Sequence, residues 1–156
     1  MVDMVLMSGR GAGPRYVNIE DANDVWTLLS PRPGTMASPA PAGIPYERLG
    51  ALGDLITPAP ILYSVELDIA EENLPAIYEW YEKEHLPMLT SVPGCLGGIR
   101  WRRLDGGAPN LMATYRFARL GVNESPEWIA GRSTEWTARV RGMFRIQRRY
   151  IRRLEA

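Results

Sequence analysis

His85 is the only histidine in the chain, and an imidazole is the side chain best suited to move a proton near neutral pH. Tyr78 and Tyr81 precede it by seven and four residues, so all three would share one face of a helix. A tyrosine hydroxyl beside an imidazole can stabilise the negative charge that develops when a proton leaves a substrate. The spacing predicts His85 and Tyr81 as catalytic residues, with Tyr78 beside them. The alternative is that these side chains only fill the core.

Four more residues could bind a small substrate beside this helix. Arg100 could pair with a carboxylate, while Trp101, Tyr115 and Trp136 offer flat aromatic surface to an apolar ring. The alternative for each is structural, because arginines on strands commonly face solvent and large aromatic residues commonly fill cores. The ligand that fits such a set is a small hydrophobic or aromatic compound.

No metal is expected at this site, because a lone histidine without partners at ligand spacing does not form a typical metal centre. One axial histidine is enough to hold haem, so our expectation of no cofactor leaves haem open.

The composition limits the possible partners. The chain carries 18 basic and 18 acidic residues, and a balanced charge argues against nucleic acid as a partner. We interpret the arginines of the C-terminal segment as a solvated face or as a complement to the acidic helix of another subunit. No apolar run approaches the ~20 residues of a membrane helix, and the first residues lack the pattern of a signal peptide. We therefore expect no membrane association and a cytoplasmic location.

The elements that would position these residues follow from hydrophobic periodicity. Alternating apolar and polar residues predict a strand over residues 61–69. Over residues 74–89 the apolar positions recur at helical spacing. This predicts a helix that begins near Asn73 and loosens near Pro87, because proline removes a backbone donor. A second strand is expected over residues 96–104.

The second half of the chain repeats this order. Residues 105–110 have the composition of a turn, and residues 111–117 alternate as a strand. Ser125 is a suitable N-cap for a helix that we expect over residues 125–141. A final strand is expected over residues 143–154.

Together these elements predict an α+β fold with the ferredoxin-like order βαββαβ, in which a four-stranded antiparallel sheet carries two helices on one face. The other face would present apolar and aromatic side chains. A monomer that exposed this face would leave a large apolar patch in water. We therefore expect two copies to pair through their sheets, which gives a homodimer with the form of a dimeric α/β barrel.

Residues 1–59 are expected to form a proline-rich N-terminal extension of the domain at residues 60–156. Residues 15–19 are predicted as a short strand and residues 20–29 as a short helix. The apolar side of that helix, which would cover the barrel, consists of Ala22, Val25, Trp26 and Leu29. Because proline cannot donate to a sheet ladder, we expect the extension to supply no strand to the sheet. Its deletion should then leave a folded, less stable dimer.

One run of residues carries a resemblance to a known family. Residues 80–87 have the sequence Trp-Tyr-Glu-Lys-Glu-His-Leu-Pro, Pro93-Gly94 closes the helix, and the next strand ends in Arg100-Trp101-Arg102. Over residues 60–154 the chain thus resembles the EthD-like family of the dimeric α/β-barrel superfamily. That superfamily includes antibiotic-biosynthesis monooxygenases, muconolactone isomerases, polyketide cyclases and haem-dependent peroxidases.

Two functions from different classes are compatible with these residues. The first is a cofactor-independent enzyme that acts on a small apolar carbonyl or phenolic compound by proton transfer, isomerisation, cyclisation or oxygenation, with His85 moving the proton. The second is a non-catalytic dimer that binds a small molecule or accompanies a catabolic enzyme. Fold alone cannot separate them. A cavity that reaches His85 would favour the enzyme, whereas an imidazole enclosed by Leu74, Ile77 and Met88 would favour the binding protein.

Overall fold

The computed structural model of the chain describes residues 2–8, 13–29 and 43–155, without the side chains of Met7 and Leu29, so the proline-rich stretch 30–42 lies outside the description. The strands are β1 (Met4–Ser8), β2 (Arg15–Asn18), β3 (Val25–Leu29), β4 (Ile44–Gly53), β5 (Ile61–Ile69), β6 (Cys95–Arg103), β7 (Leu111–Phe117) and β8 (Phe144–Leu154). The α-helices are α1 (Leu74–Trp80), α2 (Leu86–Thr90), α3 (Pro126–Gly131) and α4 (Glu135–Val140). Shorter turns are η1 (Glu71–Asn73), η2 (Tyr81–His85), η3 (Val122–Glu124) and η4 (Arg141–Met143).

Within the described residues, eight strands close into one barrel in the order β1-β3-β2-β8-β5-β7-β6-β4. The portion β8-β5-β7-β6 is the four-stranded antiparallel sheet predicted from the sequence. The other four strands come from the N-terminal region and bridge the two edges of that sheet. β2 pairs with β8, with Tyr16 opposite Leu154, and β4 pairs with β6, with Arg48 opposite Trp101. The sheet is therefore part of a closed barrel formed by a single chain.

Two predictions about the N-terminal region are wrong. Residues 1–59 do supply strands, because a proline excludes only its own position from a ladder and β4 has its single proline, Pro45, near its start. Residues 20–29 do not form a helix. The backbone turns at Asp21, whose carbonyl accepts from Asp24 N–H at 3.0 Å, and then continues as β3. The β-branched and aromatic residues of β3 suit a strand with a neighbour on each side.

The strand predicted at residues 15–19 is confirmed as β2. The division of the chain into an extension at residues 1–59 and a domain at residues 60–156 stays a prediction.

The inner face of the four-stranded sheet is covered by the chain itself. Leu62, Trp101 and Met112 lie in one cluster inside the barrel. The N-terminal residues of this cluster are Met4, Leu6, Tyr16, Trp26 and Tyr46. The expectation that a second copy covers this face is therefore wrong, because strands of the same chain already remove these side chains from water. A homodimer through another surface stays a prediction.

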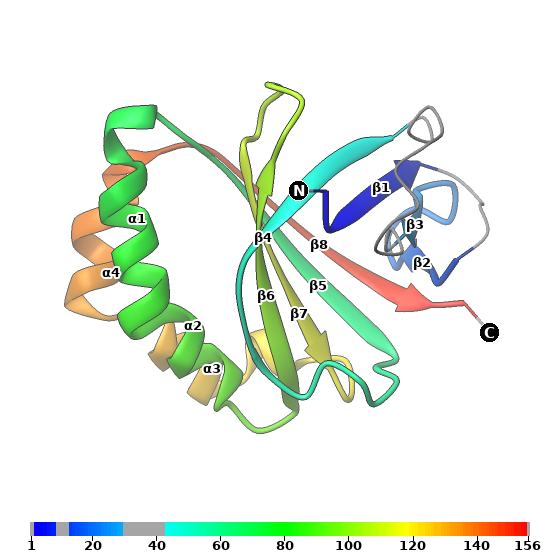
Figure 1. The fold of residues 1–156 in the computed structure, drawn as a ribbon. Helices are drawn as coiled ribbons and strands as arrows, with labels where there is room; N and C mark the ends of the chain where they lie inside the picture. The colour runs from blue at the N-terminus through cyan, green and yellow to red at the C-terminus, as the bar shows by residue number, and fades with distance from the viewer. Residues whose placement is uncertain (1, 9–12, 30–42, 156) are drawn as a thin grey trace.

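The helices lie together against the outer face of the sheet, on the side away from β1, β2 and β3 (Figure 1). The segments α1, η2 and α2 follow one another without a gap, which confirms the predicted first helix. In η2, Leu86 N–H donates to Tyr81 O, five residues back, as in a π-helix. Pro87 has no N–H to offer to the carbonyl of Lys83. The predicted loosening near Pro87 is thus a π-helical turn, and this turn contains His85.

The helix predicted over residues 125–141 is divided into α3 and α4. Ser125 caps α3 as predicted, since its Oγ accepts from Trp128 N–H at 3.2 Å. Thr134 caps α4 in the same way and accepts from Thr137 N–H at 3.1 Å. Serine and threonine favour such caps over helix interiors, which explains the break. In the described part of the chain, no helix is long and apolar enough to cross a membrane.

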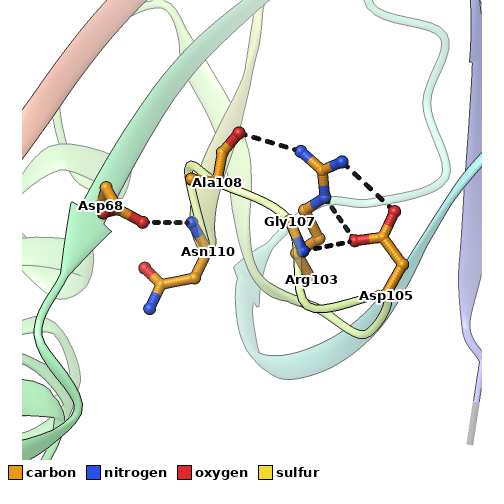
Figure 2. Close-up of polar contacts among 6 residues, drawn as sticks. All are labelled: Asp68, Arg103, Asp105, Gly107, Ala108 and Asn110. Atoms are coloured by element: carbon orange, nitrogen blue, oxygen red, sulfur yellow. Dashed lines mark hydrogen bonds and ion pairs between the residues drawn. The ribbon is translucent and has the colours of Figure 1, made fainter.

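The connection between β6 and β7 is the turn expected at residues 105–110, and polar contacts hold its shape (Figure 2). Asp105 Oδ1 accepts from Gly107 N–H at 2.9 Å and pairs with Arg103 Nε at 2.6 Å. Arg103 Nη1 also donates to Ala108 O at 3.1 Å. Arg103 at the end of β6 and Asp105 in the turn therefore fix the connection that leads into β7.

The same turn is tied to the end of β5. Asp68 Oδ1 accepts from Asn110 N–H at 3.2 Å (Figure 2). The side-chain amide of Asn110 bonds to both backbone groups of Ile69, accepting from N–H at 3.0 Å and donating to the carbonyl at 2.8 Å. One asparagine thus replaces the strand pairing that is lost where β5 ends.

Candidate functional site

A small cavity, called here the helix–sheet cavity, lies between the helices and the outer face of the sheet. Its volume is about 40 Å³. Three of the predicted site residues line it: Tyr81 and His85 from η2, and Tyr115 from β7. The imidazole is thus not simply enclosed by Leu74, Ile77 and Met88. A cavity reaches His85, and this is the arrangement that we expected to favour an enzyme.

His85 is held in place by the aromatic residues around it. Its ring stacks on Trp80, with centroids 4.0 Å apart, and meets Tyr81 edge-on at 5.3 Å. Trp80 is fixed in turn, because its Nε1 donates to Thr137 Oγ1 at 3.3 Å. His85 is 9% exposed, and its Nδ1 is buried without a hydrogen-bond partner in the described residues. π-helical turns such as η2 are frequent at functional sites.

Tyr115 provides a second buried polar atom. It stands opposite Tyr63 of β5, and the two rings are 6.2 Å apart. Trp128 of α3 packs edge-on against both rings, at 5.0 Å from Tyr115 and 5.7 Å from Tyr63. The hydroxyl of Tyr115 is buried and has no partner among the residues that the structure describes. Because buried polar atoms are nearly always paired, two without partners in one cavity suggest a missing hydrogen-bonding group.

The charged residues that line the helix–sheet cavity are all arginines. They are Arg132 after α3, Arg141 in η4 and Arg149 in β8. Among the lining residues described, there is no carboxylate. None of the three arginines forms an ion pair within the described ranges. This positive rim favours a ligand that carries negative charge or an electron-rich ring.

Burial controls the protonation of the site. It lowers the pKa of His85 from its ordinary value of 6.5 to about 3, and the positive charge of Arg149 contributes to the same direction. Burial also raises the pKa values of Tyr81 and Tyr115 well above 10. Near neutral pH the cavity therefore presents a neutral imidazole and neutral hydroxyls. This differs from the expectation of an imidazole that titrates near neutral pH, and burial accounts for the difference.

Tyr78 and Arg100 lie beside Tyr81 but do not line the cavity. The guanidinium carbon of Arg100 is 5.4 Å from the ring centroid of Tyr78 and 5.0 Å from that of Tyr81. Arg100 is only 6% exposed, so it faces the helices and not the solvent. The Tyr78 hydroxyl is also buried and unpaired within the described residues. These two residues thus form the layer behind Tyr81.

The structure does not bring Trp101 and Trp136 to the cavity. Trp101 points into the barrel, where its Nε1 donates to Thr114 Oγ1 at 3.0 Å. Trp136 packs at the edge of the helical core. Trp128 lines the cavity, as its aromatic side chain allowed, whereas sequence reasoning missed Tyr63 as a lining residue. No local pattern shows the cross-strand register that sets Tyr63 opposite the tyrosine of β7.

The described residues of the helix–sheet cavity fit neither a metal ion nor haem. In the described residues, no group of three or more His, Cys, Asp or Glu side chains could hold a metal ion. Haem would need an axial ligand that faces an open slot, but His85 stacks on Trp80 and faces a cavity of about 40 Å³. Cavities for drug-sized ligands span ~300–1,000 Å³, and a porphyrin is larger than such ligands. The residues present do not fit haem.

Comparison with known proteins identifies the fold. No protein-family profile and no curated protein sequence matches the chain. A ferredoxin-fold protein of Listeria monocytogenes, described as uncharacterised and related to antibiotic biosynthesis monooxygenases, has a TM-score of 0.69 at 9% identity, over 98% of this chain and 94% of that one. A haem-degrading enzyme of Listeria monocytogenes has a TM-score of 0.67 at 10% identity, over 97% and 99% of the two chains. A major regulator of staphylococcal pathogenesis has a TM-score of 0.68 at 8% identity, over 98% and 99%.

The chain has a ferredoxin-like fold, like that of the first of these proteins. The matches extend over nearly its whole length, so the likeness includes the N-terminal strands as well as the four-stranded sheet. At this level of identity the likeness shows the fold alone. The narrower resemblance to the EthD-like family stays a prediction.

Proposed function

We propose that this protein binds a compact aromatic or carbonyl compound in the helix–sheet cavity and transfers a proton on it. The observation that carries the proposal is a pair of buried atoms without a partner among the described residues, His85 Nδ1 and Tyr115 Oη, on two residues that line one cavity. The solved structures with this fold include a protein related to antibiotic biosynthesis monooxygenases and a haem-degrading enzyme. These two structures support an enzyme that acts on a small molecule, but they do not indicate the substrate of this chain.

The lining supports a ligand with one oxygen atom and a flat apolar body. The Tyr115 hydroxyl can donate to a carbonyl or phenolic oxygen, and the rings of Tyr63 and Trp128 offer aromatic walls. A ring-sized ligand requires more than the present volume. The side chains of Arg141 and Arg149 are exposed, so their movement can widen the rim.

Proton transfer at this site starts from the neutral imidazole. When a ligand gives a proton to His85, negative charge develops on the ligand oxygen. The Tyr115 hydroxyl and the guanidinium of Arg149 then stabilise this oxygen. The new negative charge also raises the proton affinity of His85 and opposes the effect of burial. Tyr81 lies edge-on to the imidazole and keeps its orientation.

A non-catalytic binding protein is the second candidate. The observation that favours it is the lowered pKa of His85, since an imidazole with a pKa of about 3 is a weak base. Both candidates use the same cavity and differ only in whether the bound molecule reacts.

Acetophenone in deuterated water tests the proposal and separates the two candidates. Removal of a proton beside its carbonyl leads to exchange of the methyl hydrogens for deuterium, which NMR detects. We expect the wild-type protein to accelerate this exchange and His85→Gln to reduce the rate by about 100-fold, because glutamine cannot take up the proton. Tyr115→Phe should weaken binding by about 10-fold through loss of one hydrogen bond. Tyr78→Phe removes an equally buried hydroxyl outside the cavity and should leave binding unchanged.

The outcomes of this experiment point in different directions. Binding without exchange would establish the non-catalytic candidate. If Tyr115→Phe bound acetophenone as tightly as the wild type, the helix–sheet cavity would not be the binding site. The same conclusion would follow if Tyr115→Phe and Tyr78→Phe weakened binding equally.

The buried neutral state of His85 has a consequence for stability. Its pKa is lower in the folded chain than in the unfolded chain, so the unfolded state takes up a proton first as the pH falls from 6.5 towards 3. Stability is therefore lost over this window. Between pH 7 and pH 5 the free energy of unfolding of the wild type should fall by about 2 kcal/mol more than that of His85→Gln. Urea unfolding at both pH values measures this difference, and parallel decreases would show that His85 titrates normally in the folded protein.

A further inference from the structure

A second cavity, called here the barrel cavity, lies inside the barrel on the face of the sheet opposite to His85. Its volume is about 390 Å³. Small-molecule sites typically span ~300–1,000 Å³, so this space is large enough for a ligand. Leu62 near the start of β5 and Arg116 near the end of β7 line it, which places it toward that end of the barrel. Barrels of eight strands either fill their interior with side chains or hold one small ligand.

The walls of the barrel cavity are largely apolar. Leu62, Ile99 and Trp101 line it from the four-stranded sheet, and Met4 and Leu28 line it from the N-terminal strands. These walls come from both halves of the chain, so the cavity exists only in the closed barrel. They suit an aliphatic chain or a ring.

The charged residues of the barrel cavity are two arginines. Arg48 and Arg116 line it, and the described lining contains no carboxylate. Arg116 is held by main-chain carbonyls, because Nη1 donates to Asp54 O at 2.5 Å and Nη2 donates to Thr57 O. The guanidinium carbon of Arg48 lies 5.6 Å from the ring centroid of Trp101. Neither arginine has an ion-pair partner within the described ranges.

We propose that the barrel cavity binds a monocarboxylic acid with an apolar chain or ring. The carboxylate would lie between Arg48 and Arg116, since guanidinium groups match the two oxygens of a carboxylate. The apolar part would extend into the barrel, where its removal from water contributes to binding. This site is separated from the helix–sheet cavity by the sheet, so the inference does not rest on the proposed function.

Decanoate is a suitable probe for the full-length protein, and isothermal titration calorimetry measures its binding. We expect saturable binding of one molecule per chain and weaker binding of the uncharged decan-1-ol. Arg48→Gln should weaken decanoate binding by about fivefold, the effect of losing one partly exposed charge contact. Arg102→Gln is the matched control, because Arg102 is exposed on β6 beside the cavity residue Trp101 and its loss changes the net charge equally.

Two substitutions that fill the cavity test the location of the ligand. Ile99→Trp from β6 and Leu28→Trp from β3 should each abolish measurable binding, and near-UV circular dichroism identifies which of them is folded. His85→Gln should bind decanoate like the wild type. The inference is overturned if wild-type protein shows no saturable binding, or if Arg48→Gln and Arg102→Gln weaken binding equally. Undiminished binding by a folded filling variant, or loss of binding in His85→Gln, would also overturn it.

Discussion

A chain that lacks residues 1–59 is expected not to form a folded monomer. The deletion removes β2 from the edge of β8 and β4 from the edge of β6. It also exposes the inner face of the sheet, including Leu62, Trp101 and Met112. Open strand edges beside a large apolar face lead to aggregation or to pairing with other chains. The sequence-based expectation of a folded, less stable dimer assumed an extension that lies outside the sheet.

Light scattering combined with near-UV circular dichroism measures the effect of this deletion. A soluble monomer with a cooperative unfolding transition would contradict the single-chain barrel. Addition of residues 1–59 as a separate polypeptide is the control, because the missing strands should restore part of the folded population. No recovery in that mixture would indicate that the connection between the halves is needed for folding.

Replacement of Arg152 by methionine is expected to lower the free energy of unfolding by about 3 kcal/mol, because it leaves a partly buried carboxylate without its ion-pair partner and removes the buried contacts of the guanidinium. Arg152 is 2% exposed inside the barrel. Its Nη2 pairs with Asp24 Oδ2 at 2.7 Å, and its Nη1 donates to Ser64 Oγ at 3.3 Å. Its guanidinium carbon also lies 3.3 Å from the ring centroid of Trp26. One side chain thus connects β8 to β5 and to the N-terminal strands.

Urea unfolding of Arg152→Met and of a matched control separates this role from a general effect of charge. Arg153→Met removes the same charge from the next residue, which is exposed, and should change stability by about 0.5 kcal/mol or less. Combining Arg152→Met with Asp24→Asn should recover part of the loss, since no unpaired carboxylate remains. If Arg152→Met were as mild as Arg153→Met, the proposed connection between the two halves would be incorrect.

Local periodicity was sufficient for the elements after residue 60. The strand at residues 61–69 and the strand at residues 111–117 have the predicted bounds, because a two-residue period depends only on which side chains face the core. The loosening of the helix near Pro87 was also predictable, because proline lacks a backbone N–H in any tertiary context. The prediction that the C-terminal arginines form a solvated face was wrong for Arg152, which is buried. An arginine on a strand looks the same in sequence whether it faces water or a partly buried aspartate.

The candidate site was predictable only in part. His85 and Tyr81 share a face because they are four residues apart on one helix, and this relation needs no tertiary information. Tyr115 joins them through the pairing of β7 with β5 and the packing of the helices over both strands. Trp101 lies on the other side of the sheet, inside the barrel, because side chains alternate along β6.

The sequence by itself determined which segments become strands and helices after residue 60, and which residues share a helix face, because these depend on side chains close together in the chain. Only the tertiary structure decided that β1, β2, β3 and β4 complete the barrel and that its interior is covered without a second copy. It also decided that His85 is buried and neutral. Closure of the barrel depends on strand pairings between residues far apart in the chain, such as Tyr16 with Leu154, and no local period encodes such a pairing.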